Sequence, residues 1–497
     1  MTRIRPAART IAVVVIVIVA LVGTACSSGD GSSTASKESG SRPGSSGATP
    51  STTTGGSGGA GASGVGDPYF PGAGNGGYDV ESYDVTADIA IQGADQIYAT
   101  ATITATATED LTSFDLDLLG FEVGGVTVQD EPAQVSRDGR EMTVTPDTTI
   151  DAGTDFTVVV EYRGAPGTES GPGAFLEDGG WVDMDDYSVV IAEPIGAATW
   201  IPSNDHPSDK ALFTLTATVP DPLEAVSNGN LVSRTSATGR STFVWKADEP
   251  MSTYLMTVAV GEYELIEQPT TGGATILNAV PPAERATGDA AFARFPEMIA
   301  FFSGSFGPYP FTAAGNLIAP GLPPLALECQ TRSVFGLEAV EGNRYGVEQI
   351  VSHELAHQWF GDAVSPATWR DIWLNESFAT YGEWLWGEHA GGPTVEQSAR
   401  SNHDQGDPAL DVAPADPGVD ELFGGAVYQR GGMFLVELQK RMGDEKFFTL
   451  LRTWVDEHKY GTATTAQFLQ LAAEINGTSI EDLSQPWLYG DTLPELS

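Results

Sequence analysis

The spacing of apolar residues changes once along this chain, and that change limits the folds open to it. Between Tyr78 and about Tyr263, apolar and polar residues alternate, as in YATATITATAT (98–108) and FTLTATV (213–219). These runs are rich in Thr and Val and are separated by Gly, Pro, Asp and Asn. Alternation places every second side chain on the same face of a sheet. We therefore predict an all-β domain over residues 67–263.

Helical periodicity replaces this alternation after about Gly273. Five of the six histidines lie in this later part of the chain. Apolar residues at three- and four-residue spacing predict helices, here at 291–306, 347–360, 375–389, 431–442, 445–458 and 465–475. One strand is expected near 323–335. Residues 264–497 are thus predicted to form a second, mainly helical domain, giving an α+β multidomain protein.

The N-terminus has the features of a targeting segment. Three arginines precede an apolar run from Ile11 to Gly23 and small residues follow it, which is the order of a signal peptide over residues 1–26. The run is shorter than the about 20 residues that span a membrane. Cys26 follows the small residues, and this end resembles the lipobox of bacterial lipoproteins. We expect export and a lipid anchor at Cys26 on the extracellular face of the cell membrane, with secretion as the alternative.

Residues 27–66 consist mainly of Gly, Ser, Thr and Ala. Such a segment cannot bury enough apolar surface to fold, so we predict a disordered linker with an r.m.s. span of about 35 Å. Cys329 is the only other cysteine. If Cys26 carries lipid, we therefore expect no structural disulfide.

Acidic residues greatly outnumber basic ones. The chain has 24 lysines and arginines against 67 aspartates and glutamates, a formal net charge of −43. Binding to nucleic acid needs basic patches that such a chain cannot supply, which excludes that class of partner. A strongly acidic surface favours a soluble monomer.

Two histidines four residues apart lie in the motif His-Glu-Leu-Ala-His at 353–357. On a helix, His353 and His357 are one turn apart on the same face, so both imidazoles can reach one metal ion. Zinc needs a third protein ligand and a fourth position left for water. Glu376, which follows His357 after the eighteen residues 358–375, provides a carboxylate on the next predicted helix. The sequence therefore predicts one zinc ion per chain.

Glu354 lies beside these histidines but is not needed as a ligand. Zinc lowers the pKa of its bound water to about 7. Glu354 can accept the proton of that water and pass it to a leaving amine. The predicted chemistry is peptide-bond hydrolysis with water as the nucleophile.

The stretch HELAHQWFGD, followed by WLNESFATY, resembles the aminopeptidase N family of gluzincins, which also holds leukotriene-A hydrolase. Upstream, AEPIGAATWIPSNDHPSDKALF (192–213), AVSNG (225–229) and DEPMSTYLMTVAVGEY (248–263) are similar to that family's N-terminal domain. The resemblance covers about residues 78–497. It implies a β saddle, then a thermolysin-like catalytic domain, and a zinc aminopeptidase acting on peptides with a free N-terminus.

The resemblance also implies roles for further residues. AVYQRGGMFLVEL is similar to the family's Tyr-x-Lys-Gly segment, so Tyr428 is expected to stabilise the oxyanion; Arg430 replaces the lysine, and we expect no consequence. LALEC lies where the family has Gly-x-Met-Glu-Asn, which implies that Glu328 binds the substrate amine. An unpaired Glu328 in this apolar stretch is otherwise costly, and a salt bridge with Arg332 is the alternative.

Glu193, in VVIAEPIG, resembles the family's second glutamate that binds the substrate amine. The alternative is that Glu193 is a loop residue at a domain interface without this role. Leu325 and Cys329 replace the family's glycine and asparagine, which leaves open how closely a substrate backbone fits along this strand. QPWLYGDTLPELS resembles the close of the catalytic domain. We therefore expect no large C-terminal helical domain and a more open cleft.

Three other functions remain. An endopeptidase would keep the zinc and Glu354 without needing Glu328 or Glu193. An epoxide hydrolase uses the same zinc, although nothing in the sequence indicates a lipid-shaped pocket. A peptide-binding lipoprotein without catalysis is disfavoured by the intact set of His353, Glu354, His357, Glu376 and Tyr428.

Overall fold

The computed structural model describes residues 59–90, 96–169 and 179–497. The expected signal peptide, Cys26 and the linker up to residue 58 lie outside the described residues. Gly59–Ala60, assigned to the linker from composition, form β1, which pairs in parallel with β4 (Leu111–Asp117). In the described part of the chain, no helix has the length and apolar character required to cross a membrane.

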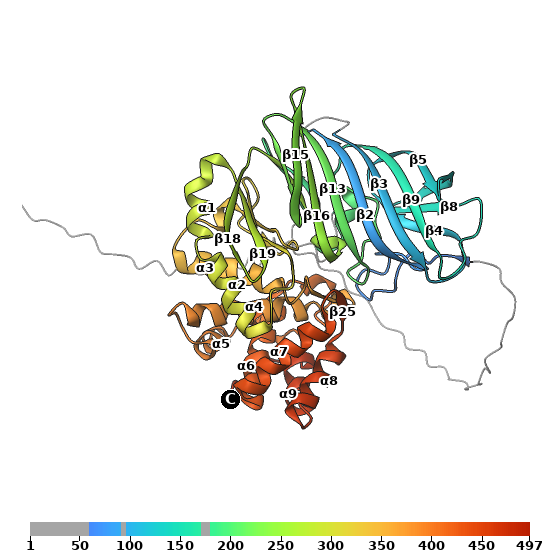
Figure 1. Ribbon diagram of the computed structural model, residues 1–497. Helices are drawn as coiled ribbons and strands as arrows, with labels where there is room; N and C mark the ends of the chain where they lie inside the picture. The colour runs from blue at the N-terminus through green and yellow to red at the C-terminus, as the bar shows by residue number, and fades with distance from the viewer. Residues whose placement is uncertain (1–58, 91–95, 170–178) are drawn as a thin grey trace, which may run out of the picture. The chain divides into compact units, whose positions relative to one another are not determined.

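The β domain is built on an eight-stranded sheet of order β15-β16-β13-β2-β3-β9-β5-β6 (Figure 1). Its strands are β2 (Tyr78–Ile89), β3 (Ile97–Ala107), β5 (Glu122–Val128), β6 (Glu131–Pro132), β9 (Asp155–Gly164), β13 (Lys210–Pro220), β15 (Asn230–Ala237) and β16 (Arg240–Ser252). Burial alternates along β3 as the sequence predicts, with Ala101 and Ile103 buried and Thr102 between them partly exposed. The period-two pattern thus defines the core face of the sheet.

Two smaller sheets complete the β domain, with the orders β1-β4-β8-β7 and β10-β11-β12-β17-β14. Their further strands are β7 (Gln134–Asp138), β8 (Glu141–Thr145), β10 (Thr168–Glu169), β11 (Gly179–Asp183), β12 (Ser188–Ile191), β14 (Glu224–Ser227) and β17 (Val258–Gly261). The second sheet matters for the site, because Glu193 lies two residues after the end of β12.

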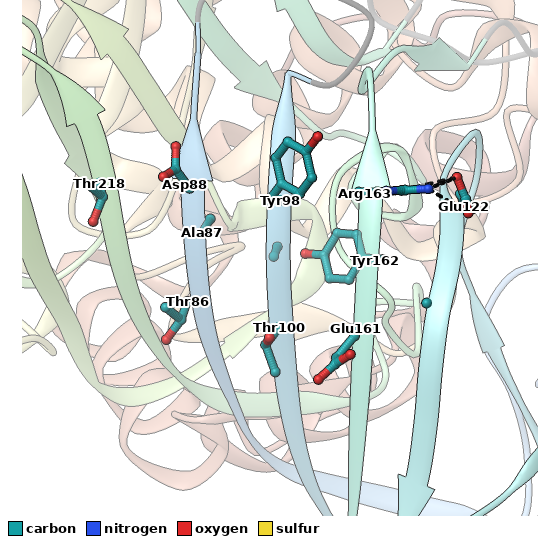
Figure 2. Close-up of a pocket in the computed structure, with 12 residues that line it drawn as sticks. Thr86, Ala87, Asp88, Tyr98, Thr100, Glu122, Glu161, Tyr162, Arg163 and Thr218 are labelled. Atoms are coloured by element: carbon teal, nitrogen blue, oxygen red, sulfur yellow. Dashed lines mark hydrogen bonds and ion pairs between the residues drawn. The ribbon is translucent and has the colours of Figure 1, made fainter.

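A hollow of about 710 Å³ lies on the eight-stranded sheet, lined by side chains such as Thr100, Tyr98 and Glu161 (Figure 2). The Arg163–Glu122 ion pair stands at one side of it. None of the predicted site residues is among the residues that line it. The chemistry predicted from the sequence therefore belongs elsewhere.

The second domain begins with a sheet that the sequence largely failed to reveal. Its order is β18-β19-β21-β23-β22, with β20 paired to β19. The strands are β18 (Glu264–Thr271), β19 (Ala274–Val280), β20 (Ala313–Ala314), β21 (Asn316–Ala319), β22 (Ala326–Leu327) and β23 (Ser333–Gly336). The prediction of a single strand near 323–335 is wrong, because β21 and β23 are short and buried at every position, so they show no alternation.

All six predicted helices are present, with α1, α5 and α9 in addition. The helices are α1 (Arg285–Ala291), α2 (Phe295–Phe306), α3 (Arg344–His357), α4 (Trp373–His389), α5 (Val395–His403), α6 (Gly431–Met442), α7 (Asp444–His458), α8 (Thr465–Asn476) and α9 (Glu481–Ser484). The helix predicted over 291–306 starts only at Phe295, since Pro296 occupies the first turn of α2, where its missing N–H costs nothing.

Helices α3 and α4, which carry the predicted zinc ligands, pack against each other closely. A side chain on Gly382 would put its Cβ 2.7 Å from the Cβ of Ala356, so glycine is required for this approach. On the other side of α4, Trp373 packs edge-to-face on Phe434 of α6 and on Phe468 of α8, with ring centroids 5.8 Å apart in both pairs. The aromatic core thus fixes α4 relative to α3.

Candidate active site

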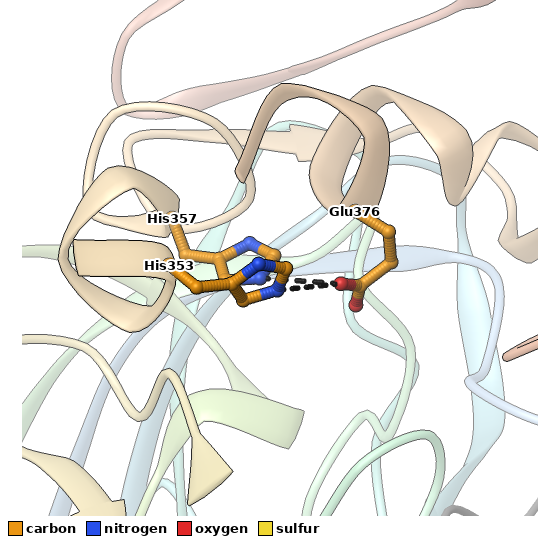
Figure 3. A group of neighbouring side chains, drawn as sticks. All are labelled: His353, His357 and Glu376. Atoms are coloured by element: carbon orange, nitrogen blue, oxygen red, sulfur yellow. Dashed lines mark hydrogen bonds and ion pairs between the residues drawn. The ribbon is translucent and has the colours of Figure 1, made fainter. Parts of the chain in front are cut away.

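The three predicted metal ligands converge on one point (Figure 3). The Nε2 atoms of His353 and His357 each lie 3.3 Å from the same oxygen, Oε2 of Glu376. Ligands about 2.0–2.1 Å from a tetrahedral zinc are separated by roughly 3.3–3.4 Å from one another. Both histidine–carboxylate distances therefore match those between the ligands of a tetrahedral zinc ion.

The other nitrogens of the two imidazoles are held by second partners. His357 Nδ1 donates to the carbonyl of Phe360 at 3.1 Å, which leaves Nε2 free to bind metal. His353 Nδ1 lies 3.6 Å from Oε2 of Glu383, and Gln349 donates to the other oxygen of that carboxylate at 2.8 Å. Sequence reasoning missed Glu383, although its position seven residues after Glu376 places it on the same face of α4.

Glu354 is buried beside the metal ligands. One carboxylate oxygen of Glu354, one of Glu328 and one ring nitrogen of His357 lie within 4.8 Å of one another. Burial raises the pKa of the Glu354 carboxyl to about 8, with the nearby carboxylates adding to the effect and the two histidines opposing it. A carboxyl buried at this position, beside the predicted metal ligands, is placed to accept and release a proton.

Two further carboxylates meet at this site from different domains. Glu193 follows β12, and Glu328 follows β22. One carboxylate oxygen from each lies within 4.8 Å of the other and of an oxygen of Glu376. Both Glu193 and Glu328 are 2% exposed, and Oε1 of each has no hydrogen-bond partner. Burial raises the pKa of both carboxyls, and for Glu193 the charge of Glu328 adds to it.

The alternative of a salt bridge between Glu328 and Arg332 is wrong. The Arg332 guanidinium donates instead to the backbone carbonyls of Ser227, Gly229 and Leu277. These carbonyls satisfy the arginine inside the protein, so Glu328 is left without a cationic partner among the described residues.

Tyr428 belongs to a π-helical turn, η8 (Ala426–Arg430), at the start of α6. Its ring stacks on the His353 imidazole, with centroids 6.0 Å apart and an interplanar angle of 22°. Burial raises the pKa of the Tyr428 hydroxyl well above its usual value, and the neighbouring carboxylates raise it further. The hydroxyl is therefore a hydrogen-bond donor at neutral pH.

Two histidines and a glutamate from packed helices, with a second glutamate between the histidines, define the site of a zinc peptidase. Comparison with known families agrees. The Peptidase M1 N-terminal domain matches residues 79–255, and the Peptidase family M1 domain matches residues 296–487. The chain belongs to peptidase family M1, and the zinc cofactor predicted from the sequence is confirmed.

Solved structures share the order of the two domains. An M1 zinc metallopeptidase from Deinococcus radiodurans is 29% identical, with a TM-score of 0.80 over 87% of this chain and 99% of that one. A mutant of that metallopeptidase bound to a Tyr-Ser-Ala substrate gives a TM-score of 0.76 at 29% identity and the same coverage. The predicted β domain followed by a helical catalytic domain is thus confirmed.

Curated relatives are longer. Probable aminopeptidase 2 of Sulfurisphaera tokodaii is 28% identical over 62% of this chain and 42% of its own length. Aminopeptidase M1 of Arabidopsis thaliana is 27% identical over 62% of this chain and 37% of its own. The chain spans less than half the length of these two relatives.

Proposed function

We propose that this protein is a zinc aminopeptidase that removes residues from the free N-terminus of peptides. The observation that carries the proposal is the pair of buried carboxylates of Glu193 and Glu328 beside the metal ligands, in each of which Oε1 has no hydrogen-bond partner among the described residues. Buried charges without partners cost several kcal/mol. The α-ammonium group of a peptide supplies the missing positive charge and hydrogen-bond donors.

This placement decides which bond is cleaved. When zinc is bound by His353, His357 and Glu376, it supplies a Lewis acid that polarises the substrate carbonyl and activates water. Glu193 and Glu328 hold the substrate ammonium close to those ligands. Only the first peptide bond of the substrate then reaches the reacting position, because the amine is one residue away from it.

Two side chains handle the proton and the developing charge. The Glu354 carboxylate accepts a proton from the attacking water and passes it to the nitrogen of the leaving amine. The Tyr428 hydroxyl donates a hydrogen bond to the oxyanion that forms on the substrate. Stacking on His353 orients the Tyr428 ring toward this position.

An aminoacyl anilide and its N-acetylated form test the proposal against an endopeptidase. The purified zinc-loaded chain is expected to hydrolyse the free-amine anilide and leave the acetylated one, since acetylation removes the positive charge that Glu193 and Glu328 bind. Comparable kcat/KM for the two anilides would reject the aminopeptidase assignment. Two similar proteins, the probable aminopeptidase 2 of Sulfurisphaera tokodaii and the aminopeptidase M1 of Arabidopsis thaliana, favour the expected result.

We further propose that the exported protein is anchored by lipid at Cys26, from the order of charged, apolar and small residues that precedes it. Full-length protein is expected in the membrane fraction, and Cys26→Ser is expected to remove the lipid label. Equal labelling of the two forms with a fatty-acid analogue would contradict the anchor.

A further inference from the structure

Arg430 closes the π-helical turn that carries Tyr428, and it is fully buried. Its Nε donates to Trp487 O at 2.8 Å. Its Nη1 donates to the carbonyls of Leu410 and Val412, both at 3.0 Å, and its Nη2 donates to those of Pro486 and Gly490, both at 2.8 Å. A guanidinium has five N–H donors, so every one of them is used.

These five bonds tie the turn to two distant segments. One is the stretch around η6 (Pro408–Asp411), and the other is η9 (Gln485–Tyr489) near the C-terminus. No carboxylate of the described residues forms an ion pair with Arg430. Burial lowers the pKa of its guanidinium, with Asp411 and Asp491 opposing the shift. Burying a charge without an ion pair adds little to stability. The main effect of the Arg430 guanidinium is therefore to fix the positions of the segments whose carbonyls it binds.

The same turn also contacts α4, which carries the metal ligand Glu376. Ser377 Oγ donates to the carbonyl of Val427 at 2.5 Å. A Cβ on Gly431 would lie only 1.7 Å from this Oγ, so the turn is pressed against α4. Tyr428 is therefore clamped between α4 on one side and the segments bound by Arg430 on the other.

We propose that Arg430 is a positioning residue that sets the distance of the Tyr428 hydroxyl from the reacting carbonyl. The proposal rests on the oxyanion role given to Tyr428 above. Lysine has three donors on one nitrogen, so it leaves at least two of the five carbonyls unbonded. The replacement of the family's lysine by arginine, from which the sequence predicted no consequence, thus has a structural purpose in this chain.

A double-mutant cycle tests whether Arg430 acts through Tyr428. In the zinc-loaded enzyme, Tyr428→Phe is expected to lower kcat about 10²- to 10³-fold. Arg430→Lys is expected to lower kcat between about 10- and 100-fold, with KM changed less than about twofold. The double variant is expected to be no slower than Tyr428→Phe alone. Multiplicative losses in the double variant, or an unchanged kcat for Arg430→Lys, would overturn the proposal.

Ligand binding separates positioning from a general loss of structure. A phosphinic peptide that mimics the tetrahedral intermediate is expected to bind Arg430→Lys more weakly by the same factor as the loss in kcat, while a free amino acid binds as to wild type. Equal weakening of both ligands would show a merely structural role and reject the proposal. Arg441→Lys, on the exposed end of α6 and paired with Asp482, is the matched control and should leave both affinities unchanged.

A second variant covers a failure of Arg430→Lys to fold. Arg430→Gln keeps a planar group with two donors, so at least three of the five carbonyls are left unbonded, and its kcat is expected to fall at least about 10-fold below that of wild type. A Gln variant as active as wild type would overturn the proposal. Failure of the Tyr428→Phe variant to lose activity would reject the oxyanion role itself, whereas the preference for free-amine anilides would still stand on Glu193 and Glu328.

Discussion

The carboxylates of Glu193 and Glu328, from different domains, approach within 4.8 Å of each other in the protein interior. Burial raises the pKa of both carboxyls; the charge of Glu328 adds to the shift of Glu193, and the charge of Glu376 adds to the shift of Glu328. A bound cation removes the repulsion. Under the proposed function, binding of the substrate amine would therefore depend on the contact between the β domain and the catalytic domain.

Glu328→Gln tests this coupling. The variant removes one charge and keeps the shape, so a charge-assisted hydrogen bond to the ammonium is lost, about 1.5–3 kcal/mol. KM for an aminoacyl anilide is expected to rise about 10- to 100-fold with a smaller change in kcat. Glu193→Gln should act in the same direction. An unchanged KM in both variants would show that the amine binds elsewhere.

Glu354→Gln is expected to lower kcat at least about 10²-fold, because the amide cannot accept the proton of the attacking water. Zinc content measured on the same preparation should stay at the wild-type level, since Glu354 is not among the three converging ligands. Activity near wild type would exclude Glu354 as the base. Loss of zinc together with activity would instead show that it supports the metal.

Glu383→Gln is expected to weaken zinc binding about 10- to 100-fold. The Glu383 carboxylate faces Nδ1 of His353 at 3.6 Å, and a negative partner at this nitrogen makes Nε2 a stronger ligand. Competition with a chromophoric chelator measures the affinity without an activity assay. Glu457→Gln, which removes an exposed charge from α7, is the control. Equal zinc affinities for the two variants would contradict a role for Glu383.

Sequence alone was sufficient where periodicity carried the information. The one-turn spacing of His353 and His357 placed both on one face of a helix, and the helix after them brought Glu376 to the same point. The alternation in β3 likewise identified its core face. In these cases, a regular element converts spacing in the chain directly into position in space.

Sequence reasoning failed where contacts join distant segments. In the sheet formed by β18 to β23, the strands β21 and β23 are short and buried at every position, so they show no alternation. The choice of partner for Glu328 depended on whether Arg332 found carbonyls in other segments, which it did. The five bonds of Arg430 reach residues up to sixty positions away. No local pattern contains such information, because it depends on how the whole chain packs.

The pH dependence of the free energy of unfolding tests the pKa of Asp209, a residue of the β domain that is not a predicted metal ligand. Asp209 is buried and accepts hydrogen bonds from the Val80 N–H at 3.2 Å and from the Asn204 side chain at 2.6 Å. Burial raises the pKa of the Asp209 carboxyl from 3.8 to about 8, the charge of Asp79 adds to it, and the two hydrogen bonds oppose it. The folded protein therefore keeps this proton in a range of pH where the unfolded chain has lost it.

The sign of the effect follows from this difference in bound protons. Between pH 3.8 and about 8 the folded state binds more protons than the unfolded state, so the contribution of Asp209 to the free energy of unfolding falls as pH rises. The slope is at most about 1.4 kcal/mol per pH unit. Asp209→Asn removes the titration and keeps an acceptor for Val80.

In urea unfolding of the metal-free protein from pH 5.5 to 8.5, the Asp209→Asn variant is expected to gain stability relative to wild type with rising pH. Asp79→Asn should give a smaller change in the same direction. Parallel pH profiles for wild type and Asp209→Asn would mean that Asp209 is already ionised in the folded protein, stabilised by its two hydrogen bonds.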